Sequence, residues 1–308
     1  MTQLATLLTL IGVVATMPGS QQAGTKTAAE RLGYPADSRL LIIHADDLAV
    51  AHSVDEASFT ALESGAVTSA SVMIPCPWLT EVAEWARSHP NADLGLHLTL
   101  TSEWKTYRWG PVAPRDQVPT LLGPDGYFWP EVAPVAEHAS PEDVEREIRA
   151  QVERAQRAGI HPTHLDIHMG TLAARPEFYA ALVKVGHEYH LPFLALRVSG
   201  PQARMLSLLA PTDPVLDSLV MFDPTIKPES WTQSYIETIA RLKPGLNEMI
   251  VHVGHDDAEL QAITVDHPDY GAAWRGRDFK AVTSPEFRQA LKDNHIALVH
   301  WKDLKKIM

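Results

Sequence analysis

The stretch "LIIHADDLAV", residues 41–50, joins an apolar run of strand length to two adjacent carboxylates, Asp46 and Asp47. The apolar run predicts a buried strand, and the two acids come where that strand ends. Successive side chains of a regular strand point to opposite faces, so we expect the two acids to have different roles. A structural interpretation stands beside the functional one, because one acid could cap the following helix while the other stays in solvent.

Apolar segments of strand length alternate with helical patterns on both sides of this stretch. Repeated strand-helix units predict an α/β fold with a parallel sheet, which is either closed as a barrel or open and doubly wound. In both architectures, functional sites lie at the carboxyl ends of the strands. The expected strands span residues 39–47, 67–74, 94–100, 161–168, 192–198, 246–253 and 296–301, and the expected helices span 53–65, 79–89, 140–159, 176–189, 230–242 and 284–294.

The first 37 of the 308 residues are expected to lie outside the folded domain. Residues 1–23 contain an apolar run followed by small and polar residues, which is typical of a signal peptide, and residues 24–37 are expected to form a linker. The run is too short and too weakly flanked to predict a stable membrane span. This pattern favours export to the periplasm or beyond the cell. The alternative is a cytoplasmic protein in which the run is an internal N-terminal helix.

Residues 38–308 are expected to fold as a single domain, because barrels of this length form one unit. A long loop at residues 101–139, rich in aromatic side chains, interrupts the alternation of strands and helices. The formal net charge of −12 disfavours nucleic acid as a partner, since such binding depends on Lys and Arg. Cys76 is the only cysteine, so any metal ligands must come from His, Asp or Glu.

Three later strand ends also carry ionisable side chains. His97 lies in "LGLHLTLT", and His252 ends the strand in "EMIVHVGHDD". In "THLDIHMG", His164, Asp166 and His168 alternate and therefore share one strand face. Such groups are costly to bury unless they are paired or bind a metal, so a hydrogen-bonded network and a metal site both explain the pattern.

Four strand ends that contribute His or Asp suggest one convergent site. Two neutral imidazoles and one carboxylate form an open site for a divalent metal, with positions left for water and substrate. A further carboxylate and imidazole can then act as base and acid, which fits metal-assisted hydrolysis. A serine esterase is disfavoured, because no G-x-S-x-G motif follows any expected strand.

The motifs "HADD", "LGLHLTLT" and "THLDIH", in this order, resemble those of the YdjC-like carbohydrate deacetylases, the family that includes chitooligosaccharide deacetylases. The similarity extends over about residues 38–308. It implies a single-domain, distorted (β/α) barrel of the TIM-like type with one divalent metal ion, Mg²⁺ or Zn²⁺. It also implies hydrolysis of the N-acetyl group of an amino sugar by a water that the ion activates.

The resemblance assigns roles to five residues by motif. Asp47, His97 and His168 correspond to the metal ligands, and Asp46 corresponds to the general base. His252 is similar to the histidine that acts as general acid or stabilises the oxyanion. Where the family usually has Phe-Gly after the acid pair, this chain has Leu and Ala at residues 48–49, which affects substrate identity more than metal binding.

A small carbohydrate is therefore the expected substrate. Trp104, Trp109 and Trp129 of the aromatic-rich loop are expected to stack on sugar rings, although such aromatics also serve to pack a long loop. Two other functions fit the same residues. One is a non-catalytic carbohydrate-binding protein on this scaffold, and the other is a metal-dependent hydrolase of a non-sugar amide or an ester. Whether the chain forms a homo-oligomer stays open.

Overall fold

The computed structural model describes residues 26–308, so the signal peptide predicted at residues 1–23 lies outside the described residues. Part of the expected linker is helical. Residues Ala28–Arg31 form α1, which Thr27 caps by accepting a hydrogen bond from the Glu30 backbone N–H. Ala29 is buried against Leu40 and Ile42 of the first strand. This part of the linker segment therefore packs onto the sheet.

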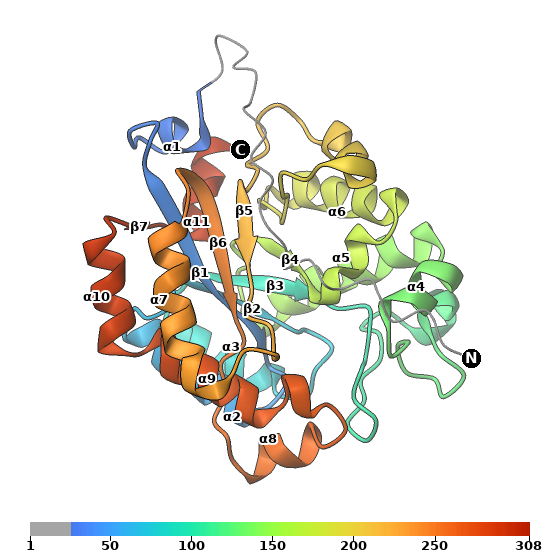
Figure 1. Ribbon diagram of the computed structural model, residues 1–308. Helices are drawn as coiled ribbons and strands as arrows, with labels where there is room; N and C mark the ends of the chain where they lie inside the picture. Colours follow the sequence, from blue (N-terminus) through green and yellow to red (C-terminus); the bar gives the residue numbers. More distant parts are fainter. Residues whose placement is uncertain (1–25) are drawn as a thin grey trace.

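The described chain forms a parallel sheet that curls, with helices around it (Figure 1). The order of the strands is β4-β3-β2-β1-β6-β5, and β7 pairs with β1. Neighbouring strands in this order pair in parallel, as the strand-helix alternation predicts. The strands are β1 (Arg39–Leu48), β2 (Ser69–Val72), β3 (Leu94–Leu98), β4 (Leu165–Ile167), β5 (Ser218–Val220), β6 (Gly245–Val251) and β7 (Ala297–Leu298).

Isolated bridges continue the hydrogen-bonded circuit between β4 and β5. Leu165 of β4 pairs with Phe193, and Leu196 pairs with Leu216, which precedes β5. The strand expected at residues 192–198 is present only as these two bridges, so that prediction is wrong in its extent. The sheet therefore curls into a distorted, TIM-like barrel within a single domain, and the predicted fold class is confirmed.

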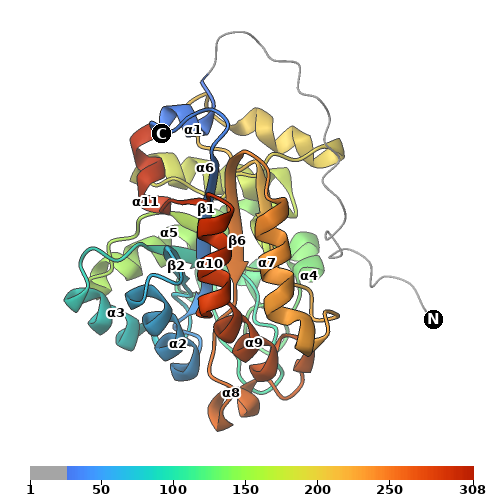
Figure 2. The ribbon, with the colours of Figure 1, turned by 60° about the vertical axis from the view of Figure 1, so that its left-hand side comes forward.

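Helices cover the outer face of the sheet. Figure 2 shows α7 and α10 in front of β1 and β6, and α2 and α3 beside them. Among residues 26–308, no helix is both long and apolar enough to cross a membrane. The α-helices after α1 are α2 (His52–Glu63), α3 (Leu79–Ser88), α4 (Val132–His138), α5 (Pro141–Ala158), α6 (Pro176–Tyr189), α7 (Trp231–Arg241), α8 (Ala258–Ile263), α9 (Ala272–Val282), α10 (Pro285–Asp293) and α11 (Trp301–Leu304).

The inner face of β1 changes from apolar to polar along the strand. Leu40 and Ile42 pack with Trp301 of α11 in an apolar cluster at the end where β1 begins. His44 and Asp46, which follow at alternate positions, are buried as well. Apolar packing thus fills one end of the barrel, and the polar groups gather toward the carboxyl ends of the strands.

The aromatic-rich loop, residues 101–139, is anchored to the rest of the domain. Thr101 pairs with Trp129 in an isolated bridge, and α4 ends the segment. The buried carboxylate of Glu147, on α5, accepts hydrogen bonds from the backbone N–H groups of Val112 and Ala113, both at 2.9 Å. One buried side chain therefore holds the middle of the loop against α5.

This anchor predicts a pH-dependent stability. Burial raises the pKa of Glu147 to about 7. Between about pH 4.3 and 7, the folded chain keeps a proton that the unfolded chain releases, so this group's contribution falls as pH rises. Relative to E147Q, the wild type should lose up to about 3 kcal/mol of unfolding free energy across that window. Urea unfolding of both proteins at several pH values measures this difference, and parallel stability curves would contradict the prediction.

Candidate active site

Asp46 and Asp47 reach the same site, contrary to the strand alternation that we expected. The Nε2 atom of His97 lies 3.7 Å from Asp46 Oδ2 and 3.4 Å from Asp47 Oδ1. The reason is local: Asp47 has a φ of 71°, and the pairing of β1 with β2 shifts register between Ala45 and Leu48. A left-handed residue at such an irregularity redirects its side chain, and for a residue other than glycine this conformation is strained.

Asp47, His97 and His168 converge on one point. Asp47 Oδ1 lies 3.4 Å from His97 Nε2 and 3.5 Å from His168 Nδ1. This oxygen is buried and has no hydrogen-bond partner, whereas Oδ2 accepts from Arg275 Nη2 at 2.8 Å. An unpaired buried carboxylate oxygen between two imidazole nitrogens fits a divalent cation, because it leaves a strong ligand atom unused. The structure thus brings together the three residues expected to bind metal.

Each of the two imidazoles has a carboxylate on its far side. His97 Nδ1 donates to Asp166 Oδ2 at 2.7 Å, and His168 Nε2 donates to Glu103 Oε2 at 3.2 Å. These bonds orient both rings so that the other nitrogen of each faces Asp47. Metal-binding histidines in proteins usually have such outer partners. Asp166 belonged to the predicted His-Asp-His series, whereas no sequence pattern indicated Glu103.

The two adjacent acids are electrostatically different. Burial by itself would raise the pKa of Asp47, but the Arg275 guanidinium and the nearby His168 and His97 imidazoles hold that pKa well below its usual range. Burial raises the pKa of Asp46 well above its usual range. Asp47 is therefore a stable anion suited to binding a cation, and Asp46 is the stronger proton acceptor.

Asp46 lies between two further histidines. His44 Nε2 is 3.3 Å from Asp46 Oδ1, and its Nδ1 lies 2.7 Å from Ser69 Oγ. On the other side, His252 Nε2 is 3.7 Å from Asp46 Oδ2, and its backbone N–H donates to Asp278. Burial lowers the pKa of His252 to about 3, so this imidazole is neutral at pH 7. The neutral His252 imidazole thus lies just beyond hydrogen-bond distance of the Asp46 carboxylate.

Comparison with protein families identifies the family of this chain. The model of the family described as "YdjC-like protein" matches residues 40–293. The chain belongs to the YdjC-like family. It is 31% identical to a carbohydrate deacetylase from Thermus thermophilus, over 86% of this chain and 94% of the relative. A carbohydrate deacetylase from Enterococcus faecalis is 27% identical, over 87% of this chain and 98% of the relative.

The solved structure of a protein from Enterococcus faecalis supports the fold of this YdjC-like protein. That Enterococcus faecalis protein, whose suggested role is cellobiose-phosphate cleavage, is 26% identical and has a TM-score of 0.74. The likeness covers 87% of this chain and 99% of the other. The site therefore lies within a barrel that extends over nearly the whole related protein.

The tryptophans expected to stack on sugars lie differently in this YdjC-like protein. Trp104 and Trp109 are each only 3% exposed, and the Trp109 indole donates to the backbone oxygen of Thr101. Trp129 is half-buried and stacks on His138, with ring centroids 4.7 Å apart. The structure corrects the expectation for Trp104 and Trp109, because buried indoles that pack the loop present no face to a sugar.

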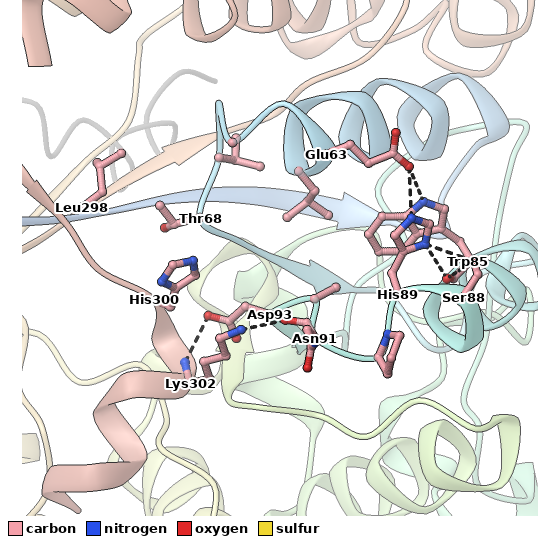
Figure 3. Close-up of a pocket in the computed structure, with 15 residues that line it drawn as sticks. Glu63, Thr68, Trp85, Ser88, His89, Asn91, Asp93, Leu298, His300 and Lys302 are labelled. Atoms are coloured by element: carbon pink, nitrogen blue, oxygen red, sulfur yellow. Dashed lines mark hydrogen bonds and ion pairs between the residues drawn. The ribbon is translucent and has the colours of Figure 1, made fainter.

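A pocket of about 510 Å³ is lined by none of the candidate active-site residues (Figure 3). Thr68 and Asp93, which line it, directly precede β2 and β3, so the pocket opens at the amino ends of those strands. His300 and Lys302 line it from the C-terminal part of the chain. Because α/β barrels place their chemistry at the carboxyl ends of strands, this pocket is separate from the candidate active site.

Proposed function

We propose that this YdjC-like protein is a metal-dependent hydrolase that removes the acetyl group from the nitrogen of an amino sugar. The relatives named carbohydrate deacetylase support the reaction class and the sugar substrate. The observation that carries the proposal is the unpaired Asp47 Oδ1 between two oriented imidazoles, with Asp46 and His252 beside it.

Asp47, His97 and His168 would hold the ion. We infer Zn²⁺ or Mg²⁺, and the two nitrogen donors favour Zn²⁺, because imidazole suits zinc whereas magnesium prefers oxygen ligands. A divalent ion there would supply Lewis acidity, which polarises an amide carbonyl and makes water a better nucleophile.

Asp46 is the proposed general base. It is buried beside the ligands without being one of the three, and its raised pKa suits it to accept a proton from the attacking water. His252, which is neutral, can donate one ring N–H to the oxyanion that develops on the amide. To protonate the leaving amine it must first receive the proton from Asp46. His252 Nε2 lies 3.7 Å from Asp46 Oδ2, so the two groups must approach to hydrogen-bond distance for that transfer.

Acetate release separates this proposal from the two other functions. Purified protein is incubated with N-acetylated chitooligosaccharides and, in parallel, with O-acetylated sugars and simple acetyl esters. We expect acetate from the N-acetylated sugars. Acetate only from the esters would favour a hydrolase of another bond, and retention of the sugar without acetate release would favour a binding protein.

A further inference from the structure

The aromatic-rich loop brings a carboxylate to the proposed metal centre. Glu103 lies in the first residues of this loop, and its Oε2 is 3.2 Å from His168 Nε2. The side chain is only 16% exposed, so water does not screen the contact strongly. The opposite ring nitrogen of His168, Nδ1, is the one that faces Asp47. Glu103 therefore contacts the ring nitrogen opposite the one that faces Asp47, which holds the ring in that orientation.

Contacts with a distant segment hold Glu103 in place. Its backbone oxygen lies 3.0 Å from His267 Nε2, and the Lys105 backbone N–H donates to Asp266 Oδ2 at 2.8 Å. Both partners lie in the connection between α8 and α9, and α9 carries Arg275, which binds Asp47. The connection that fixes the loop thus leads directly into the helix that orients the Asp47 carboxylate.

A second anchor ties the loop to the segment that directly follows the strand with the acid pair. The Tyr107 hydroxyl donates to the backbone oxygen of Val50 at 2.7 Å, three residues after Asp47. Trp104, between these anchors, packs near the Arg275 guanidinium, 5.9 Å from it. Residues 103–107 are therefore joined to several of the elements that build the site.

We propose that Glu103 is a positioning residue for the metal centre and that ordering of residues 103–107 and binding of the ion stabilise each other. The carboxylate fixes the His168 ring with Nδ1 toward Asp47, so the ion meets a ligand that is already oriented. Coupling of this kind is reciprocal: if the ordered loop strengthens ion binding by some factor, the bound ion favours the ordered loop by the same factor. The inference rests on the proposed function only through the metal site.

Metal affinity of the full chain tests the positioning role without any substrate. Competition with a chromophoric chelator gives the Zn²⁺ affinity of the wild type, E103A, E103Q and the control D125N. We expect E103A to bind Zn²⁺ about 10–100-fold more weakly. E103Q should fall between E103A and the wild type, since an amide oxygen still accepts from His168 Nε2. Wild-type affinity in E103A would overturn the inference.

Asp125 is a matched control, because it is a carboxylate of the same loop that pairs with Arg108 and is 49% exposed. D125N should bind Zn²⁺ like the wild type, and an equal loss in D125N and E103A would show a general effect of loop packing and overturn the positioning role. H168A separates the two proposals. If H168A also binds Zn²⁺ normally, the metal centre itself is wrong. If H168A loses affinity while E103A does not, only the role of Glu103 is wrong.

Hydrogen exchange tests the reciprocal part. Zn²⁺ should slow backbone exchange in residues 103–107 of the wild type and of D125N, and should slow it much less in E103A at Zn²⁺ concentrations that saturate both proteins. Equal slowing in E103A and the wild type would overturn the coupling between loop and ion. Circular dichroism of each variant confirms that the barrel is folded during these measurements.

Discussion

Replacement of Asp46 by asparagine is expected to lower kcat for acetate release by about 10²–10⁴-fold, the usual contribution of a general base. Asparagine has nearly the same shape and keeps one oxygen toward His44, so the surrounding packing should persist. It cannot accept a proton from water. The bound ion should remain, because Asp47, His97 and His168 are unchanged.

Acetate release and elemental analysis on the same samples check this expectation. D125N serves again as the control, since it removes a half-exposed carboxylate that pairs with Arg108 and contacts none of the proposed site residues in the described chain. A D46N protein with the wild-type rate would show that Asp46 is not the base. Loss of the ion from D46N would instead assign Asp46 to the metal ligands.

Replacement of Asp47 by alanine is expected to abolish ion binding and to lower the unfolding free energy of the protein. The Arg275 guanidinium, 5% exposed and 2.8 Å from Asp47 Oδ2, would be left as an unpaired buried charge. Breaking a buried ion pair in this way costs about 3–5 kcal/mol of unfolding free energy. Turnover should fall to background, because the only carboxylate of the proposed ligand set is lost.

The double variant D47A/R275M separates these two effects. Methionine fills the space beside Trp104 without a charge, and replacing both members of a buried ion pair by apolar groups is often neutral for stability. We expect urea unfolding to show most of the stability restored, while ion content and acetate release stay absent. Recovery of ion binding in the double variant would exclude Asp47 as a ligand, and persistence of the full destabilisation would exclude the unpaired Arg275 as its cause.

Periodicity in the sequence is sufficient to predict the parallel α/β architecture, because each strand of the sheet must be apolar enough to be buried beneath helices. The alternation His164, Asp166, His168 likewise predicts which side chains share a face, and the structure places Asp166 against His97. Local pattern works in these cases because the feature is set by neighbours in the sequence.

Features that depend on distant contacts or on unusual backbone geometry could not be predicted in this way. Alternation assigns Asp46 and Asp47 to opposite faces, and only the left-handed conformation of Asp47 brings both into one site. Arg275 meets Asp47 across 228 residues of sequence, and Glu103 reaches His168 across 65. Neither Arg275 nor Glu103 lies in a periodic pattern that indicates its partner.

The burial of Trp104 and Trp109 is a further example. Their spacing is compatible with a sugar-binding surface, but whether a tryptophan in a long loop faces solvent depends on how the loop folds back. Here the Trp109 indole finds a buried acceptor, the Thr101 backbone oxygen, which composition cannot reveal.

Acetate release from an N-acetylated chitooligosaccharide before and after chelation, with ion content determined on the same samples, tests the central claim most directly. The account predicts one divalent ion per chain, loss of turnover together with loss of the ion, and recovery of both when Zn²⁺ is returned. Undiminished acetate release from protein shown to be free of metal would contradict it.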